Sequence, residues 1–63
     1  MPKRIKYTAW AVNKAGQHEY VEGETKFDEA YQSRNDACGI ARWDLRQRGY
    51  REPHVDNTTI VDS

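Results

Sequence analysis

The sequence has few of the residues that build a large aliphatic core. Leu45 is its only leucine, and isoleucine, leucine and valine together number 8 among 63 residues. A chain of this length has room for one domain, residues 1–63, and buries only about 60% of the surface that it exposes when unfolded. Aromatic side chains must therefore supply much of the burial. The candidates are Tyr7, Trp10, Tyr20, Phe27, Tyr31, Trp43 and Tyr50.

An excess of charge of either sign is also missing. Lysine and arginine number 10, and aspartate and glutamate also number 10, so the formal net charge is zero. This balance argues against a general nucleic-acid or membrane binder, because phosphate neutralisation favours an excess of lysine and arginine. Charged residues make up 32% of the chain, but the zero net charge and the aromatics argue against disorder. We expect a folded domain.

The chain has one cysteine and no long apolar run. Cys38 alone cannot form an internal disulfide. No stretch approaches the roughly 18 apolar residues of a membrane span or the shorter core of a signal peptide. These features favour a reduced, cytoplasmic setting.

Two extended segments are predicted in the first third of the chain. Apolar and polar residues alternate over 4–12, which is typical of a strand. Residues 13–16 supply turn residues, and a second extended run covers 17–23. The two runs should pair as an antiparallel hairpin that Gly23 ends.

The segment 24–32 is ambiguous in sequence. Thr25, Phe27 and Tyr31 stand at even spacing, as in an extended segment, whereas Asp28 is also a residue type that opens a helix. We interpret 24–32 as an extended arm.

The clearest local signal is a helix over 34–48. Ser33 is suited to cap its first backbone N–H groups, with Asp36 three residues on as in a capping box. Gly49 is placed for the left-handed residue after the helix end, and Pro53 bars continuation.

The helical spacing predicts which side of this helix is buried. Ala37, Ala41 and Leu45 form one apolar line, and Trp43 falls outside it. Cys38, beside that line, is expected to be a small buried residue rather than a nucleophile.

The expected fold is a small α+β domain with β-β-α-β order. The segment 55–61 is β-branched and predicts a third strand. The three strands should form an antiparallel sheet of spatial order 2-1-3, with the helix on one face and the other face open. We expect the helix to cover Ile5, Tyr7, Ala9 and Ala11, since small residues allow close approach. Trp10 should then lie on the open face.

No catalytic or metal-binding motif is present in the sequence. Cys38, His18 and His54 are not paired at a spacing typical of zinc ligands. The acidic residues between 19 and 29 favour a solvated surface over an acid–base pair, since a short chain rarely encloses the cleft that such a pair needs. We expect no enzymatic activity, cofactor or metal.

Two groups of residues have the composition of binding surfaces. Trp43 stands beside Arg42 and Arg46, residue types that dominate interface hot spots. Its alternative role is packing against the arm through Phe27 or Tyr31. Trp10 and Tyr20 on the open face suit stacking on nucleic-acid bases, or else they complete the core.

The leading hypothesis is a small intracellular protein-binding module that acts by occlusion. In scale it is similar to the inhibitors of host enzymes or defence complexes that bacteriophages and mobile elements encode. The alternative is a nucleic-acid-binding accessory protein that uses the aromatic sheet face and helix arginines. A homodimer is favoured over a monomer, because small domains gain stability by burying surface between chains. The expected partner-binding residues are Trp43, Arg46, Arg42, Trp10, Tyr20, Glu22 and Glu24.

Overall fold

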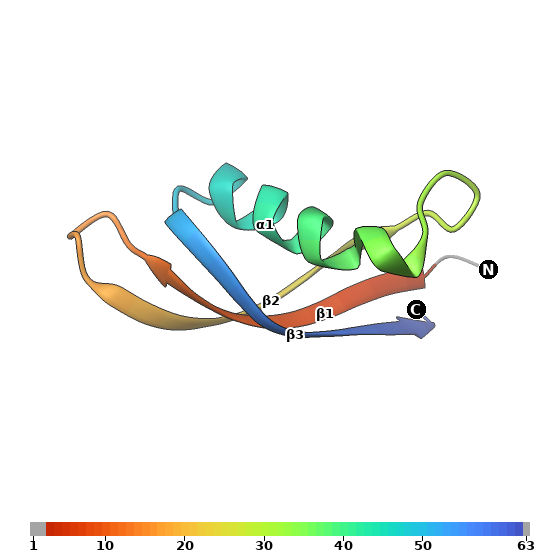
Figure 1. Cartoon of the computed structure of the whole chain (residues 1–63), viewed down its shortest axis with the longest axis horizontal. Helices are drawn as coiled ribbons and strands as arrows, with labels where there is room; N and C mark the ends of the chain where they lie inside the picture. The colour runs from red at the N-terminus through yellow and green to blue at the C-terminus, as the bar shows by residue number, and fades with distance from the viewer. Residues whose placement is uncertain (1–2, 63) are drawn as a thin grey trace.

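The fold of residues 3–62 is a three-stranded antiparallel sheet with one helix on one face (Figure 1), described by a computed structural model. The sheet order is β2-β1-β3, so β1 is central and both neighbours pair with it antiparallel. The predicted β-β-α-β architecture is confirmed. Its elements are β1 (Lys3–Val12), β2 (His18–Phe27), a 3-10 turn η1 (Arg34–Asp36), α1 (Ala37–Gln47) and β3 (Arg51–Asp62).

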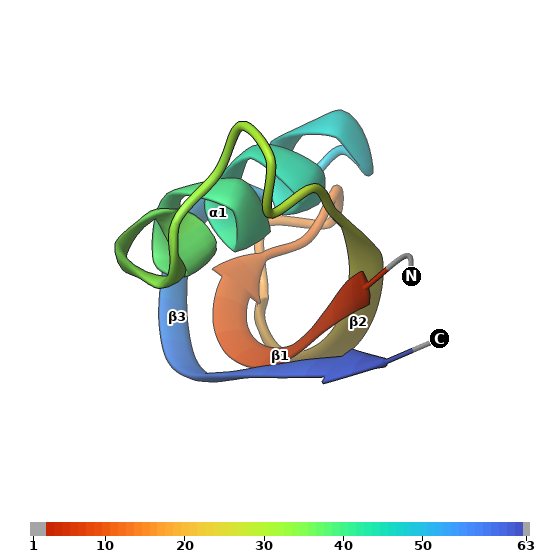
Figure 2. The same ribbon diagram turned by 90° about the vertical axis from the view of Figure 1, so that its right-hand side faces the viewer.

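The two faces of β1 differ sharply in burial, as its alternating sequence predicts. Ile5, Tyr7, Ala9 and Ala11 are buried, whereas Trp10 is half exposed. Successive side chains of a strand point to opposite faces, so the buried set lies beneath α1 and Trp10 lies on the open face. Figure 2 shows the strands curving around α1, which lies on their inner side.

The core is thin and contains fewer aromatic residues than the sequence predicts. Among the aromatics, only Tyr7 and Phe27 are buried, and Tyr50 packs partly buried against the core. The alanines add little volume to the core, but their short side chains let the helix backbone lie close to the sheet. The remaining core residues are Ile5, Ala9, Val21, Ala37, Ala41 and Leu45.

Gly23 does not end the second strand, contrary to the prediction. β2 continues through it to Phe27, and Gly23 pairs with Tyr7 of β1. A Cβ at this position would collide with the Tyr7 ring. The glycine therefore makes room for an aromatic neighbour rather than breaking the strand.

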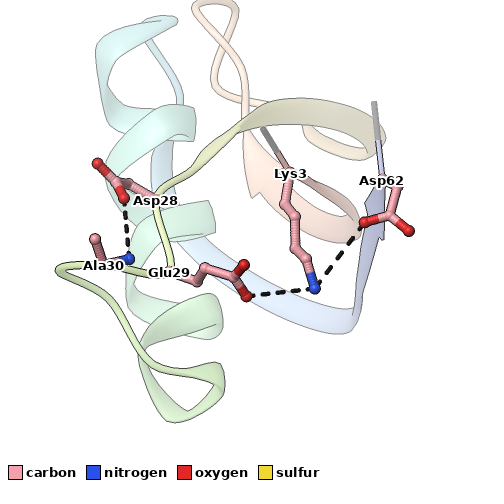
Figure 3. Close-up of polar contacts among 5 residues, drawn as sticks. All are labelled: Lys3, Asp28, Glu29, Ala30 and Asp62. Carbon is pink, nitrogen blue, oxygen red and sulfur yellow. Dashed lines mark hydrogen bonds and ion pairs between the residues drawn. The ribbon is translucent and has the colours of Figure 1, made fainter. Parts of the chain in front are cut away.

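The predicted arm is divided between β2 and a turn. After Phe27, Asp28 accepts a hydrogen bond from the backbone N–H of Ala30 at 3.0 Å (Figure 3). The backbone N–H of Gln32 bonds to the carbonyl of Asp28 at 2.9 Å, which closes the turn.

One lysine connects this turn to the start of β1 and the end of β3. Lys3 Nζ lies 3.3 Å from Glu29 Oε2 and 4.0 Å from Asp62 Oδ1 (Figure 3). The turn after β2 is thereby held near the start of β1 and the end of β3.

The helix begins and ends at the predicted signals. Ser33 is the N-cap residue, and its backbone N–H donates to Asp36 Oδ2 at 2.9 Å. The first turn, however, is 3-10 rather than α. At the other end Gly49 has φ of 95°, the left-handed conformation that glycine adopts without a steric cost.

β3 begins at Arg51, earlier than predicted, and passes through Pro53. Proline is tolerated here because β3 is an edge strand. Its pairing with β1 shifts register twice, between Thr8 and Ala9 and between Trp10 and Val12. Glu52, within the second irregularity, has φ of 48°, which is unusual for a residue with a Cβ.

Candidate functional site

Trp43 is exposed on the outer side of α1. Its exposed fraction is 62%, and Arg42 and Arg46 beside it are also exposed. Packing against the arm through Phe27 or Tyr31 does not bury the indole, since Trp43 stays 62% exposed and Tyr31 is itself 87% exposed. The structure therefore brings together the three residues that the sequence grouped here.

Surface hollows lie on both sides of Trp43. One groove runs between α1 and β2, with Thr25, Ile40 and Trp43 among its lining residues. A second hollow lies between α1 and the start of β3, lined by Arg42, Trp43, Arg46 and their neighbours Gly39, Glu52 and Pro53. The indole therefore forms a ridge between two depressions.

Trp10 and Tyr20 form an aromatic pair on the open sheet face. They are opposite residues in the β1–β2 ladder, with ring centroids 5.2 Å apart in an edge-to-face arrangement. Their exposed fractions are 50% and 46%. On the other side of Trp10, His54 is its partner in β3, so three rings are set in a row across the sheet. Neither Trp10 nor Tyr20 completes the core.

The acidic residues do not form one continuous surface. Glu22 and Glu24 lie on the open face with Trp10, since they alternate with the buried Val21 along β2. Glu24 forms an ion pair with Arg4 and is the ladder partner of Lys6. The open face is consequently mixed in charge.

Glu19 lies on the helix side of the sheet and has separate partners. Its carboxylate accepts hydrogen bonds from Asn13 Nδ2 at 3.1 Å and from the Tyr50 hydroxyl at 2.9 Å. These bonds lower the pKa of Glu19, and the bond to Glu19 raises the pKa of Tyr50. Glu19 therefore connects the hairpin to Tyr50, in the loop between α1 and β3.

A polar cluster between sheet and helix was not found by the sequence reasoning. The Tyr7 hydroxyl donates to Asp44 Oδ2 at 2.5 Å, and Arg48 Nη1 donates to the Tyr7 oxygen at 3.2 Å. Burial, with the bond to Asp44, raises the pKa of Tyr7 to about 12. The available signal was the helical spacing, because Asp44 and Arg48 stand three residues after Ala41 and Leu45 and continue their buried line.

The remaining candidates for chemistry are dispersed. Within residues 3–62 no three histidine, cysteine, aspartate or glutamate side chains are placed to hold a metal ion. Cys38 is exposed, so the prediction of a buried residue is wrong. Cys38 lies in the first turn of α1, just after the 3-10 turn η1, and outside the buried line that Ala37 and Ala41 form.

Comparison with protein-family models, with curated proteins and with solved structures found no match to this chain. In the described part of the chain, α1 is too short and too polar to cross a membrane.

Proposed function

We propose that the protein is a small non-enzymatic module that binds another protein through the outer side of α1. The observation that supports this most strongly is Trp43, which is 62% exposed between two surface hollows and flanked by Arg42 and Arg46. Tryptophan and arginine are enriched among residues whose truncation weakens an interface most. Exposing an indole to water has no benefit for the isolated domain, since its burial would be favourable.

The charges around Trp43 indicate the kind of partner surface that fits. Arg42 and Arg46 lie on the same side of the helix as the indole, with Glu52 across the second hollow. An acidic partner surface with an apolar depression complements this arrangement. Binding of such a surface would cover it, so occlusion of a host enzyme or defence complex is the mode of action that we propose.

A pull-down with matched variants tests the proposal. The unchanged protein, Trp43→Ala, Arg46→Glu and Tyr31→Ala are immobilised and exposed to bacterial lysate, and the affinity for the captured protein is then measured by titration. Truncation of a central interface residue costs 2 kcal/mol or more, roughly thirtyfold in affinity. We expect that loss for Trp43→Ala and Arg46→Glu but not for Tyr31→Ala, although Tyr31 is the more exposed aromatic residue.

Thermal melts of the same variants separate binding from folding. Because Trp43 and Arg46 are exposed, both variants should melt within a few degrees of the unchanged protein. A folded Trp43→Ala protein that keeps its full affinity for the captured protein would refute the assignment.

Nucleic-acid binding by the open face is the second candidate function. The row formed by Tyr20, Trp10 and His54 favours it, because exposed rings in a row across a sheet can stack on successive unpaired bases. Trp10 fluorescence titrated with mixed single-stranded oligonucleotides tests it, in a Trp43→Phe background that removes the second indole. Binding that weakens steeply with salt, and is lost in Tyr20→Ala, which keeps the Trp10 probe, would favour this function over the first.

A further inference from the structure

The outer edge of β3 is a free edge of the sheet. β3 pairs only with β1 among the described strands, so along Arg51–Asp62 the outward backbone N–H and C=O groups face away from the sheet. In Figure 1 the second half of β3 forms the lower margin of the sheet, on the side away from α1. Such an edge is a template for pairing with a further strand.

The second half of β3 lacks the features that usually protect an edge. The stretch Asn57–Val61 carries no charge and no proline, and four of its five residues are β-branched. By contrast, the β2 edge carries Glu22, Glu24 and Lys26 on one face. Charged residues, proline and bulges are the means by which proteins prevent edge pairing.

The first half of β3 has two of these protective features. It contains Pro53, and both register shifts against β1 lie at or before Asn57. Regular strand geometry therefore coincides with the uncharged stretch, which leaves Asn57–Val61 as the segment suited to pairing. Ile60 and Val61 are only half-buried, so added strand pairing there would remove further apolar surface from water.

We propose that this edge pairs antiparallel with the same edge of a second copy of the chain, which gives a continuous six-stranded sheet. A second copy fits because a two-fold axis within the uncharged stretch places uncharged residues of the two copies opposite each other at its centre. The pairing is independent of the outer side of α1, which carries the function proposed above.

Charge repulsion selects the register of this pairing. With Thr59 on the two-fold axis, Asp56 of each copy would face Asp62 of the other, and like charges directly opposite each other are destabilising. With Thr58 on the axis, Asn57 faces Thr59 and Asp56 faces the uncharged Ile60, so the two acidic residues are no longer opposed. The geometry therefore favours Thr58 as the central residue.

Sedimentation equilibrium over a range of concentrations tests the proposal. We expect a dimer for the unchanged protein and a dissociation constant raised about tenfold or more by Thr59→Lys, because a lysine on the edge opposes pairing. Thr8→Lys is the matched control, since it adds the same charge to the same sheet face on the central strand. It should leave the dimer intact.

A double variant tests the register. With Thr58 on the axis, Asn57→Glu combined with Thr59→Lys sets a glutamate of each copy against a lysine of the other and should restore the dimer to within about threefold. With Thr59 on the axis the two lysines would face each other and the double variant would stay dissociated, which would overturn this register.

Two results would overturn the edge pairing itself. One is a monomeric mass for the unchanged protein at every concentration. The other is a dimer that Thr8→Lys or Trp10→Ala dissociates while Thr59→Lys does not, since that pattern belongs to stacked open faces.

Discussion

The ring of Tyr7 lies against the backbone of Gly23, its partner in the β1–β2 ladder. A Cβ at position 23 would collide with the ring and would lie 2.8 Å from Arg48 Nη1. Beyond the glycine, the Tyr7 hydroxyl reaches Asp44 on the helix. Glycine at position 23 of β2 is therefore required for the hydrogen bonds by which Tyr7 connects the sheet to α1.

Replacement of Gly23 by alanine should destabilise the protein. The added methyl group must displace the Tyr7 ring, which carries the bonds to Asp44 and Arg48, and overpacking of this kind costs about 1–3 kcal/mol. The measurement is the midpoint of urea unfolding followed by circular dichroism.

Gly39→Ala is the matched control for this substitution. Gly39 lies within α1, and a Cβ there meets no atom within 4 Å. Alanine is favoured over glycine in a helix by about 1 kcal/mol, so this variant should be more stable than the unchanged protein. Equal midpoints for the two variants would contradict the close packing of Tyr7 on Gly23.

The raised pKa of Tyr7 predicts a loss of stability at alkaline pH. Its pKa is about 12 in the folded protein, against about 10 in an unfolded chain. The folded state holds the proton more tightly, so the contribution is fully present below pH 10 and is lost as the pH rises from 10 to 12. The loss should be on the order of 2 kcal/mol. This loss can be measured as the shift of the urea unfolding midpoint at several pH values between about 9 and 12, the range that spans these two pKa values.

Tyr7→Phe identifies the residue responsible for this dependence. Ultraviolet absorbance of tyrosinate should show one late-ionising tyrosine with a pKa of about 12 in the unchanged protein, and this late step should be missing in Tyr7→Phe. The variant should also lose the Tyr7 share of the alkaline destabilisation. If the late-ionising tyrosine persists in Tyr7→Phe, the assignment to Tyr7 is wrong.

The start of the helix depends on Asp36 as much as on Ser33. Asp36 Oδ2 accepts from the Ser33 backbone N–H at 2.9 Å and from the Ser33 hydroxyl at 3.2 Å. Ser33→Ala should cost about 1 kcal/mol of unfolding free energy as the loss of an N-cap residue. Asp36→Ala should cost at least as much, because it also removes a negative charge from the helix N-terminus.

Urea midpoints of these two variants should be compared with that of Asp56→Ala. Asp56 is exposed in β3, so its replacement removes the same charge away from the helix. If the midpoint of Asp36→Ala is no lower than that of Asp56→Ala, Asp36 does not stabilise the start of the helix.

Elements with strong local signals could be predicted from the sequence. The alternation around Ile5, Tyr7 and Trp10 predicted both faces of β1, and the helical spacing predicted that Trp43 lies outside the buried line. The exposure of Trp43 follows from the geometry of its own helix, whereas the open-face position of Trp10 also required the small side chains of Ala9 and Ala11, which let the helix approach the other face.

Features that depend on contacts between elements could not be predicted. Gly23 resembles a strand end until its ladder partner is known to be Tyr7. The helical spacing can place Asp44 and Arg48 near the sheet, but no local pattern pairs them with Tyr7, which is far away in the sequence. The early start of β3 was also missed, since Pro53 is typical of a loop unless the strand is known to lie at an edge.

Glu52 offers a test of the irregular start of β3. Its φ of 48° lies in the left-handed region, which costs a residue with a Cβ roughly 1–2 kcal/mol. Glycine adopts this conformation without that cost, but its unfolded state has more conformational freedom. Glu52→Gly should therefore raise the unfolding free energy by about 0.5–1 kcal/mol, measured by urea unfolding.

Arg51→Gly is the control, because Arg51 is the neighbouring residue of β3 and does not have a positive φ. Glycine in an ordinary strand position lowers stability by about 0.5–1 kcal/mol, so the two adjacent substitutions should shift the midpoint in opposite directions. If both lower it, the left-handed backbone at Glu52 does not carry the expected strain, and the turn into β3 is held by Glu52 side-chain contacts along the hollow that it shares with Trp43 and Arg46.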